Sequence, residues 1–176
     1  MRLFIGIETG NARDALWDAA TTIARLSSGR SVRKNNIHLT LKFLGEARDI
    51  GRIAAAMDSV CRRAREFCLE PDEVVYKERQ KMAWCTLQGD LPPLRRLQED
   101  LENALAACGF KKEKRPFMPH ITLVRDVYKK WDTQAVKLDK KSFAVPRLVL
   151  FESLSQAGGL AYVPRHIAEF GVEHGG

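Results

Sequence analysis

The chain has 176 residues, a usual length for one domain, and its hydrophobic content of 45% is enough to fill a core. Lys and Arg outnumber Asp and Glu by 29 to 22, and the resulting charge of +7 favours a polyanionic partner such as nucleic acid or a phosphorylated ligand. Apolar runs such as 148–151 are far too short to cross a bilayer, and the first residues lack a signal-peptide pattern. We therefore expect a single soluble, cytoplasmic domain over residues 1–176, with no membrane contact.

The first half of the chain alternates between strand and helix patterns. Residues 2–8 are a short apolar run rich in strand formers, and residues 11–26 carry apolar side chains at helical spacing. The basic, turn-prone stretch 27–36 predicts a loop, and residues 37–45, IHLTLKFLG, alternate like a strand. A second helix is expected at 49–67.

Pro71 is expected to break this second helix. Residues 74–89 then predict two strands around a charged turn, and residues 90–110 predict a helix with proline near its start and glycine past its end. Residues 117–126, FMPHITLVRD, alternate like the earlier histidine strand. The last segments flank Gly158 and Gly159, which predicts a closing hairpin.

The pattern occurs twice. A strand, a helix, a basic loop and an HLTL strand in the first half correspond to a strand, a helix, a basic loop and an HITL strand in the second. The spacing from Phe4 to Trp84 in the leading strands is nearly the same as that from His38 to His120. An internal duplication explains this, although two common strand-helix-strand units could also coincide.

Both histidines are followed two residues later by threonine. Side chains two apart on a strand face the same way, so His38 with Thr40 and His120 with Thr122 each present an imidazole and a hydroxyl together. If an approximate two-fold axis relates the halves, the four groups converge on one cleft. There the threonines can donate hydrogen bonds to phosphate oxygens, while one histidine deprotonates water and the other protonates the leaving oxygen. Histidine suits both roles because its ordinary pKa is about 6.5.

Other interpretations of these motifs remain open. If only one of the two histidine–threonine motifs were present, we would interpret its histidine as a core residue or as a surface residue of a strand. The presence of both motifs favours a functional role. A metal site would need a third ligand, but Glu46, Asp49 and Asp126 do not lie on the motif face, so we expect no metal and no cofactor. A non-catalytic module that binds a nucleotide or an RNA end is excluded only by activity.

The segments RLFIGIE, IHLTLKFLGE and FMPHITLVR resemble the signatures of the bacterial RNA 2',3'-cyclic phosphodiesterases, also called 2'-5' RNA ligases, in the two-histidine phosphoesterase superfamily. The resemblance implies an α+β fold of two lobes, each an antiparallel sheet with helices outside, and a cleft between them. It also implies that His38 protonates the leaving O3' and that His120 activates water, leaving a 2'-phosphate end. Thr40 and Thr122 would hold the phosphate oxygens. The residues alone do not assign the two histidine roles.

Three further residues are candidates for substrate binding. Arg125 matches an arginine that the family places near the substrate, but strict alternation turns it away from His120 unless the strand ends or twists near Val124. Lys42 continues the face of His38, although a solvated lysine fits equally well. Phe4 either lines the floor of the cleft or belongs to the core.

The basic loops 30–36 and 111–116 either rim the cleft or are simply solvated. The expected partner is RNA with 2',3'-cyclic phosphate ends, tRNA fragments included, or a related nucleotide. The same cleft could also join such an end to a 5'-hydroxyl as a 2'-5' linkage. A self-contained duplicated fold predicts a monomer. His166 and His174 lack a threonine partner and are expected to be a hairpin and a tail residue.

Overall fold

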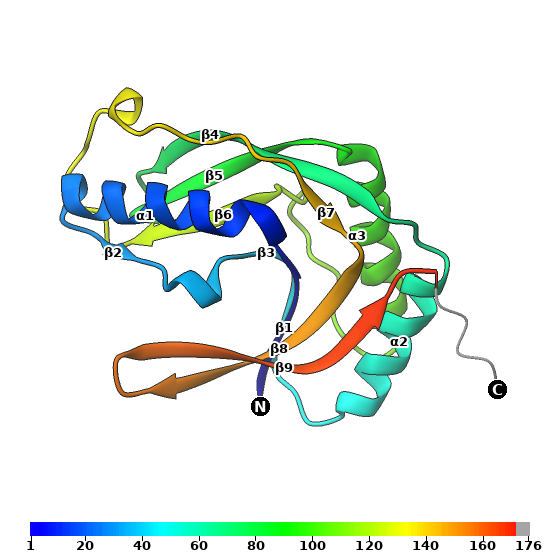
Figure 1. The fold of residues 1–176 in the computed structure, drawn as a ribbon. Coiled ribbons are helices and arrows are strands. Elements are labelled where there is room, and N and C mark those ends of the chain that lie inside the picture. The colour runs from blue at the N-terminus through cyan, green and yellow to red at the C-terminus, as the bar shows by residue number, and fades with distance from the viewer. Residues whose placement is uncertain (172–176) are drawn as a thin grey trace.

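The computed structural model describes residues 1–171, which form two antiparallel sheets with three α-helices around them (Figure 1). The first sheet has the strand order β3 (His38–Glu46), β1 (Arg2–Glu8), β8 (Arg147–Gln156) and β9 (Gly159–Glu169). The second has the order β2 (Arg30–Ser31), β6 (His120–Arg125), β5 (Met82–Gly89), β4 (Phe67–Lys77) and β7 (Phe143–Val145). The predicted α+β fold of two sheets with helices outside is confirmed.

The helices are α1 (Arg13–Ser27), α2 (Ile50–Arg62) and α3 (Leu91–Ala106). Each buries one apolar stripe, as their sequence periodicity predicts. The Asp49 carboxylate caps α2 by accepting a hydrogen bond from the Arg52 amide, and prolines occupy the first turn of α3, where a missing amide proton costs least. No helix among residues 1–171 is both long enough and apolar enough to span a membrane.

The two halves repeat one motif. β1 pairs with β3 and β5 pairs with β6, so the strand orders β3-β1-β8-β9 and β6-β5-β4-β7 correspond. The helices cross between the halves: α1 packs on β6 and β2 of the second sheet, whereas α3 packs against α2 and β3 (Figure 1). Each sheet is therefore covered by a helix that follows a strand of the other sheet.

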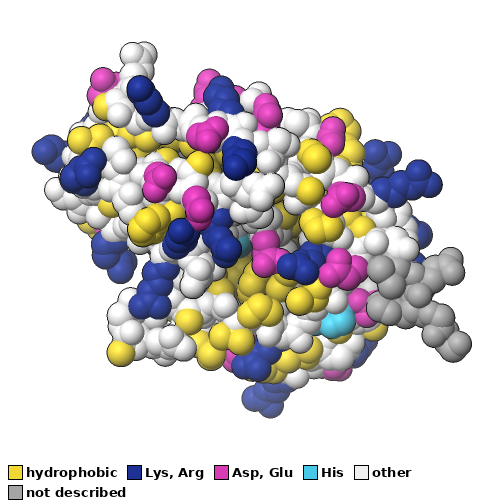
Figure 2. Space-filling view, viewed as in Figure 1, with side chains coloured by type: hydrophobic (Ala, Val, Ile, Leu, Met, Phe, Trp, Pro, Cys, Tyr) yellow, Lys and Arg dark blue, Asp and Glu magenta, His cyan; other side chains and the backbone are white. Residues whose placement is uncertain are grey.

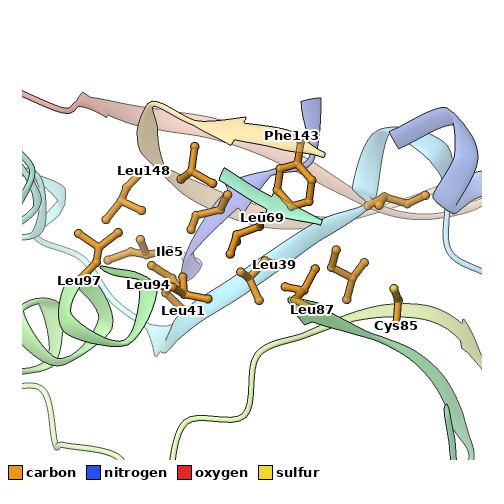
Figure 3. Close-up of a cluster of buried hydrophobic side chains, with 14 of the residues drawn as sticks. Ile5, Leu39, Leu41, Leu69, Cys85, Leu87, Leu94, Leu97, Phe143 and Leu148 are labelled. Atoms are coloured by element: carbon orange, nitrogen blue, oxygen red, sulfur yellow. The ribbon is translucent and has the colours of Figure 1, made fainter. Parts of the chain in front are cut away.

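The two sheets share one hydrophobic core (Figure 3). Ile5, Leu39 and Leu41 come from the first sheet, Leu69 and Leu87 come from the second, and α3 adds further leucines. These side chains are almost completely buried, so neither sheet covers its apolar face alone. We propose that both lobes fold as one domain.

Three expectations about the elements were wrong. The helix predicted to reach Phe67 ends at Arg62, because Phe67 begins β4 and pairs with Val145. Pro71 lies within β4 at a register shift, where the interrupted ladder tolerates a residue without an amide proton. The loop predicted at 27–36 contains the short strand β2, which pairs with β6.

Replacing Leu39 by alanine tests the shared core. Leu39 is fully buried in the first sheet, so Leu39→Ala should lower the free energy of unfolding by about 3 kcal/mol. The tryptophans Trp17, Trp84 and Trp131 lie on or against the second sheet and its covering helix. In urea unfolding, tryptophan fluorescence and far-UV circular dichroism should shift together to lower denaturant. A fluorescence transition that stays in place would show that the lobes are independent.

Candidate active site

The structure brings the two predicted histidine–threonine pairs together. β3 carries His38 and Thr40, β6 carries His120 and Thr122, and the two strands contact each other. All four side chains line a single cavity of about 410 Å³. The convergence that the sequence predicted is therefore present in the geometry.

Both imidazoles are held by the same local hydrogen bond. Nδ1 of His38 lies 2.7 Å from the Asn36 carbonyl oxygen, and Nδ1 of His120 lies 2.8 Å from that of Met118, in each case two residues earlier. A carbonyl oxygen can only accept, so Nδ1 of each ring carries the proton and donates. Nε2 of each neutral ring then carries the lone pair. This tautomer leaves Nε2 available for proton transfer.

Threonine and aromatic side chains surround the two rings. The Thr40 hydroxyl lies 2.6 Å from Nε2 of His38 and donates to it while that nitrogen is unprotonated. Phe4 and Tyr162 pack against His38, with ring centroids 4.8 Å and 5.2 Å away. Trp84 stacks on His120 with centroids 3.7 Å apart. These contacts fix both ring planes.

The surroundings favour the neutral form of both imidazoles in the free protein. Burial lowers the pKa of His38 to about 4, and the nearby Arg125 guanidinium acts in the same direction. Burial also lowers the pKa of His120. An anion placed between the rings would favour their protonated forms, because an opposite charge raises the pKa of a histidine. Burial thus favours two neutral imidazoles in the free site, and a bound anion would act in the opposite direction.

Matching β-bulges change which side chains reach the cavity. In β3, Thr40 pairs with Gly6 but Lys42 pairs with Ile5, so Leu41 is an extra residue. In β6 a register shift follows Thr122 in the same way, next to Ala83 and Trp84 of β5. Such an insertion reverses the alternation of side chains beyond it.

As a result, the residue five positions after each histidine faces the cavity. Arg125 lines it from β6, because the register shift between Thr122 and Val124 interrupts the strict alternation that would turn it away from His120. Phe43 lines it from β3 and is 73% exposed. Period-two counting did not predict a role for Phe43. The signal available in the sequence is that Phe43 and Arg125 stand at the same offset from their histidines.

The structure does not place Lys42 in the cavity that both histidines line. Its side chain is buried, and its ammonium group lies 2.9 Å from the Glu102 carboxylate and 2.6 Å from the Lys111 carbonyl oxygen. The bulge at Leu41 turns it away from His38. Phe4 is 4% exposed and lines the cavity, so it belongs both to a small apolar cluster and to the lining.

The basic loop before β3 is engaged in internal contacts. Arg30 forms an ion pair with Asp126, Lys34 lies 2.9 Å from Asp14, and Arg33 donates to the Gly158 carbonyl in the β8–β9 turn. On the face shown in Figure 2, Lys and Arg side chains are scattered among acidic ones instead of gathering in one patch. In this first loop, the positive charge helps to hold the fold.

The remaining polar candidates lie elsewhere. His166 is a residue of the hairpin strand β9, as predicted, and its Nε2 lies 2.7 Å from the Asp58 carboxylate. His174 lies outside the described residues. Within residues 1–171, no three His, Cys, Asp or Glu side chains are grouped in a way that could hold a metal ion.

Two histidine–threonine strands from related halves that face one cavity define a two-histidine phosphoesterase. The chain belongs to the 2'-5' RNA ligase superfamily, whose family model matches residues 12–155.

Some of the curated relatives and solved structures match nearly the whole chain. The RNA 2',3'-cyclic phosphodiesterase of Escherichia coli is 30% identical over an alignment of 168 residues that covers 93% of each chain. The protein of the same name from Thermotoga maritima is 29% identical over 97% of this chain and 96% of its own length. Escherichia coli LigT, solved with 3'-AMP, superposes with a TM-score of 0.76 at 28% identity and covers 96% of this chain and 97% of its own.

The lowered pKa of His38 should make stability depend on pH. The unfolded chain takes up a proton at His38 near pH 6.5, whereas the folded protein resists it down to about pH 4. Stability from this residue is therefore complete above pH 6.5 and is lost as the pH falls towards 4, by at most about 3 kcal/mol. The melting temperature of His38→Gln should fall less between pH 7 and pH 4.5 than that of the unmodified protein.

His166→Gln is the matched control, because His166 lies outside the cavity. The melting temperature of His166→Gln should fall at least as much between pH 7 and pH 4.5 as that of the unmodified protein. Equal losses of melting temperature in His38→Gln and the unmodified protein would contradict the burial argument.

Proposed function

We propose that the protein hydrolyses 2',3'-cyclic phosphate ends of RNA to 2'-phosphate ends, with two histidines as acid and base and without a metal. The observation that carries the proposal is the cavity in which His38, Thr40, His120 and Thr122 meet, with both Nδ1 atoms already committed to carbonyl oxygens. The names of the relatives support the substrate class. The positive charge of the chain agrees with a polyanionic ligand.

The chemistry follows from placing phosphorus between the two Nε2 atoms. His120 accepts a proton from water, and the water oxygen attacks phosphorus as the bond to O3' breaks. Protonated His38 donates its Nε2 proton to the departing O3', which leaves the phosphate on O2'. His38 ends neutral and His120 ends protonated, and exchange with solvent restores the starting state. The assignment of the two roles rests on the family resemblance.

Protonation of His38 also frees Thr40. While Nε2 of His38 is a lone pair, the Thr40 hydroxyl donates to it. Once Nε2 carries the proton, that hydroxyl can donate to a non-bridging phosphate oxygen instead, as Thr122 does from the other strand. Binding of the anion, protonation of His38 and the reorientation of Thr40 thus favour one another.

Arg125 supplies a guanidinium that lines the cavity from β6. It can pair with the phosphate or stack on the base of the terminal nucleotide.

The proposal is tested with an RNA oligonucleotide ending in a 2',3'-cyclic phosphate, incubated with the protein in EDTA. The expected product is a 2'-phosphate end, formed at the same rate with and without the chelator. Inhibition by EDTA that added zinc reverses would indicate a metal-assisted reaction. No turnover at all would favour a module that binds RNA ends, and joining to a 5'-hydroxyl strand would favour ligation.

Removing either imidazole should abolish most of the activity. His38→Ala and His120→Ala should each lower kcat by roughly 10²–10⁴-fold, since each removes one proton-transfer group. Tyr128→Ala is the control, because Tyr128 is 76% exposed and does not line the cavity. Far-UV circular dichroism would show that the variants keep their fold. Turnover close to normal in either histidine variant would reject the acid-base pair.

A further inference from the structure

A second cavity of about 340 Å³ opens beside the first one. The two share Thr40, Phe43 and His120, but His38 lines only the first. The second cavity therefore continues the site on the His120 side. We call it the side cavity, and its other lining residues include Gln98, Arg115, Phe117 and Met118.

The outer wall of the side cavity is held in place by buried contacts. The ion pair between Lys42 and Glu102 is almost fully buried, with 6% and 10% of these side chains exposed. Lys42 also donates to the Lys111 carbonyl, and the Glu102 carboxylate accepts from the Glu113 amide at 3.0 Å. These bonds attach the segment before β6 to β3 and α3. The wall is thus formed before any ligand binds.

The surface of the side cavity combines exposed apolar groups with polar ones. Phe43 is 73% exposed and Met118 is 60% exposed, although both are large hydrophobic residues. Phe117 adds a second aromatic ring, and Gln98 and Arg115 add hydrogen-bond donors.

Charge in the side cavity is balanced. Lys42 neutralises Glu102, and the cavity is lined by one more acid, Glu113, and one more base, Arg115. An uncharged flat group with hydrogen-bonding edges fits this surface better than a phosphate does.

We propose that the side cavity is a subsite for a second nucleobase, distinct from the base of the nucleotide that carries the cyclic phosphate. This inference rests on the proposed function. The first cavity, at about 410 Å³, suits a single nucleotide, and the side cavity adjoins it, because Thr40, Phe43 and His120 line both. The second base comes from the preceding nucleotide of the same RNA strand or from a separate strand.

The test compares three substrates: adenosine 2',3'-cyclic phosphate, the dinucleotide ApA with a 2',3'-cyclic phosphate end, and the same dinucleotide without its 5' base. The abasic compound keeps the extra sugar and phosphate, so its comparison with ApA isolates the base. We expect kcat/KM for ApA to exceed that of the abasic compound by roughly tenfold, the effect of one stacked base. Met118→Ala and Arg115→Ala should each reduce that ratio by about threefold or more.

Tyr128→Ala and Arg79→Ala are matched controls, because both residues are exposed and line neither cavity. They should keep the ratio of the unmodified protein. If ApA has no advantage but free adenosine inhibits hydrolysis of the mononucleotide, and Met118→Ala weakens that inhibition, the second base comes from a separate strand.

If ApA has no advantage and adenosine does not inhibit, while the mononucleotide is still hydrolysed, the side-cavity subsite is overturned and the proposed function stands. If none of the three substrates is hydrolysed, both are overturned.

Discussion

The active-site geometry depends on the apolar core that the two sheets share. His38 and His120 belong to different sheets, so their separation is set by how Leu39, Ile121 and their neighbours pack between the strands. α1 and α3 each pack on the sheet of the other half, which ties the lobes together. A cavity between two rigid, jointly packed sheets can hold two imidazoles at a fixed distance from one phosphorus atom.

The two walls of the cavity repeat one strand motif and differ in one residue that it presents. Each strand repeats the same elements: a carbonyl two residues before the histidine, a threonine two residues after it, and a bulge beyond the threonine. The residue that each bulge directs into the cavity differs, Phe43 on one side and Arg125 on the other. Two similar strands therefore present different side chains to the cavity, the aromatic ring of Phe43 and the guanidinium of Arg125.

Local patterns in the sequence were enough to predict most of the fold and the four central residues, because strand alternation is a property of neighbouring residues. The predictions for the end of α2 and for Pro71 were wrong, because they depend on the pairing of β4 with β5 and β7, which is a long-range interaction. The bulge at Leu41 explains why Lys42 does not face the cleft as expected and why no role was predicted for Phe43. A bulge depends on pairing with the partner strand, which local alternation does not show. The buried pairing of Lys42 with Glu102 likewise needs tertiary contacts to be seen.

The division of roles between the histidines is the central claim, and a change of leaving atom tests it most directly. In a substrate whose O3' is replaced by sulfur, the departing thiolate needs little help from an acid, because its pKa lies far below that of a ribose hydroxyl. Hydrolysis of this substrate by His38→Ala should recover to near the rate of the unmodified protein, while His120→Ala stays inactive. Equal defects of both variants on the oxygen and sulfur substrates would contradict acid catalysis by His38.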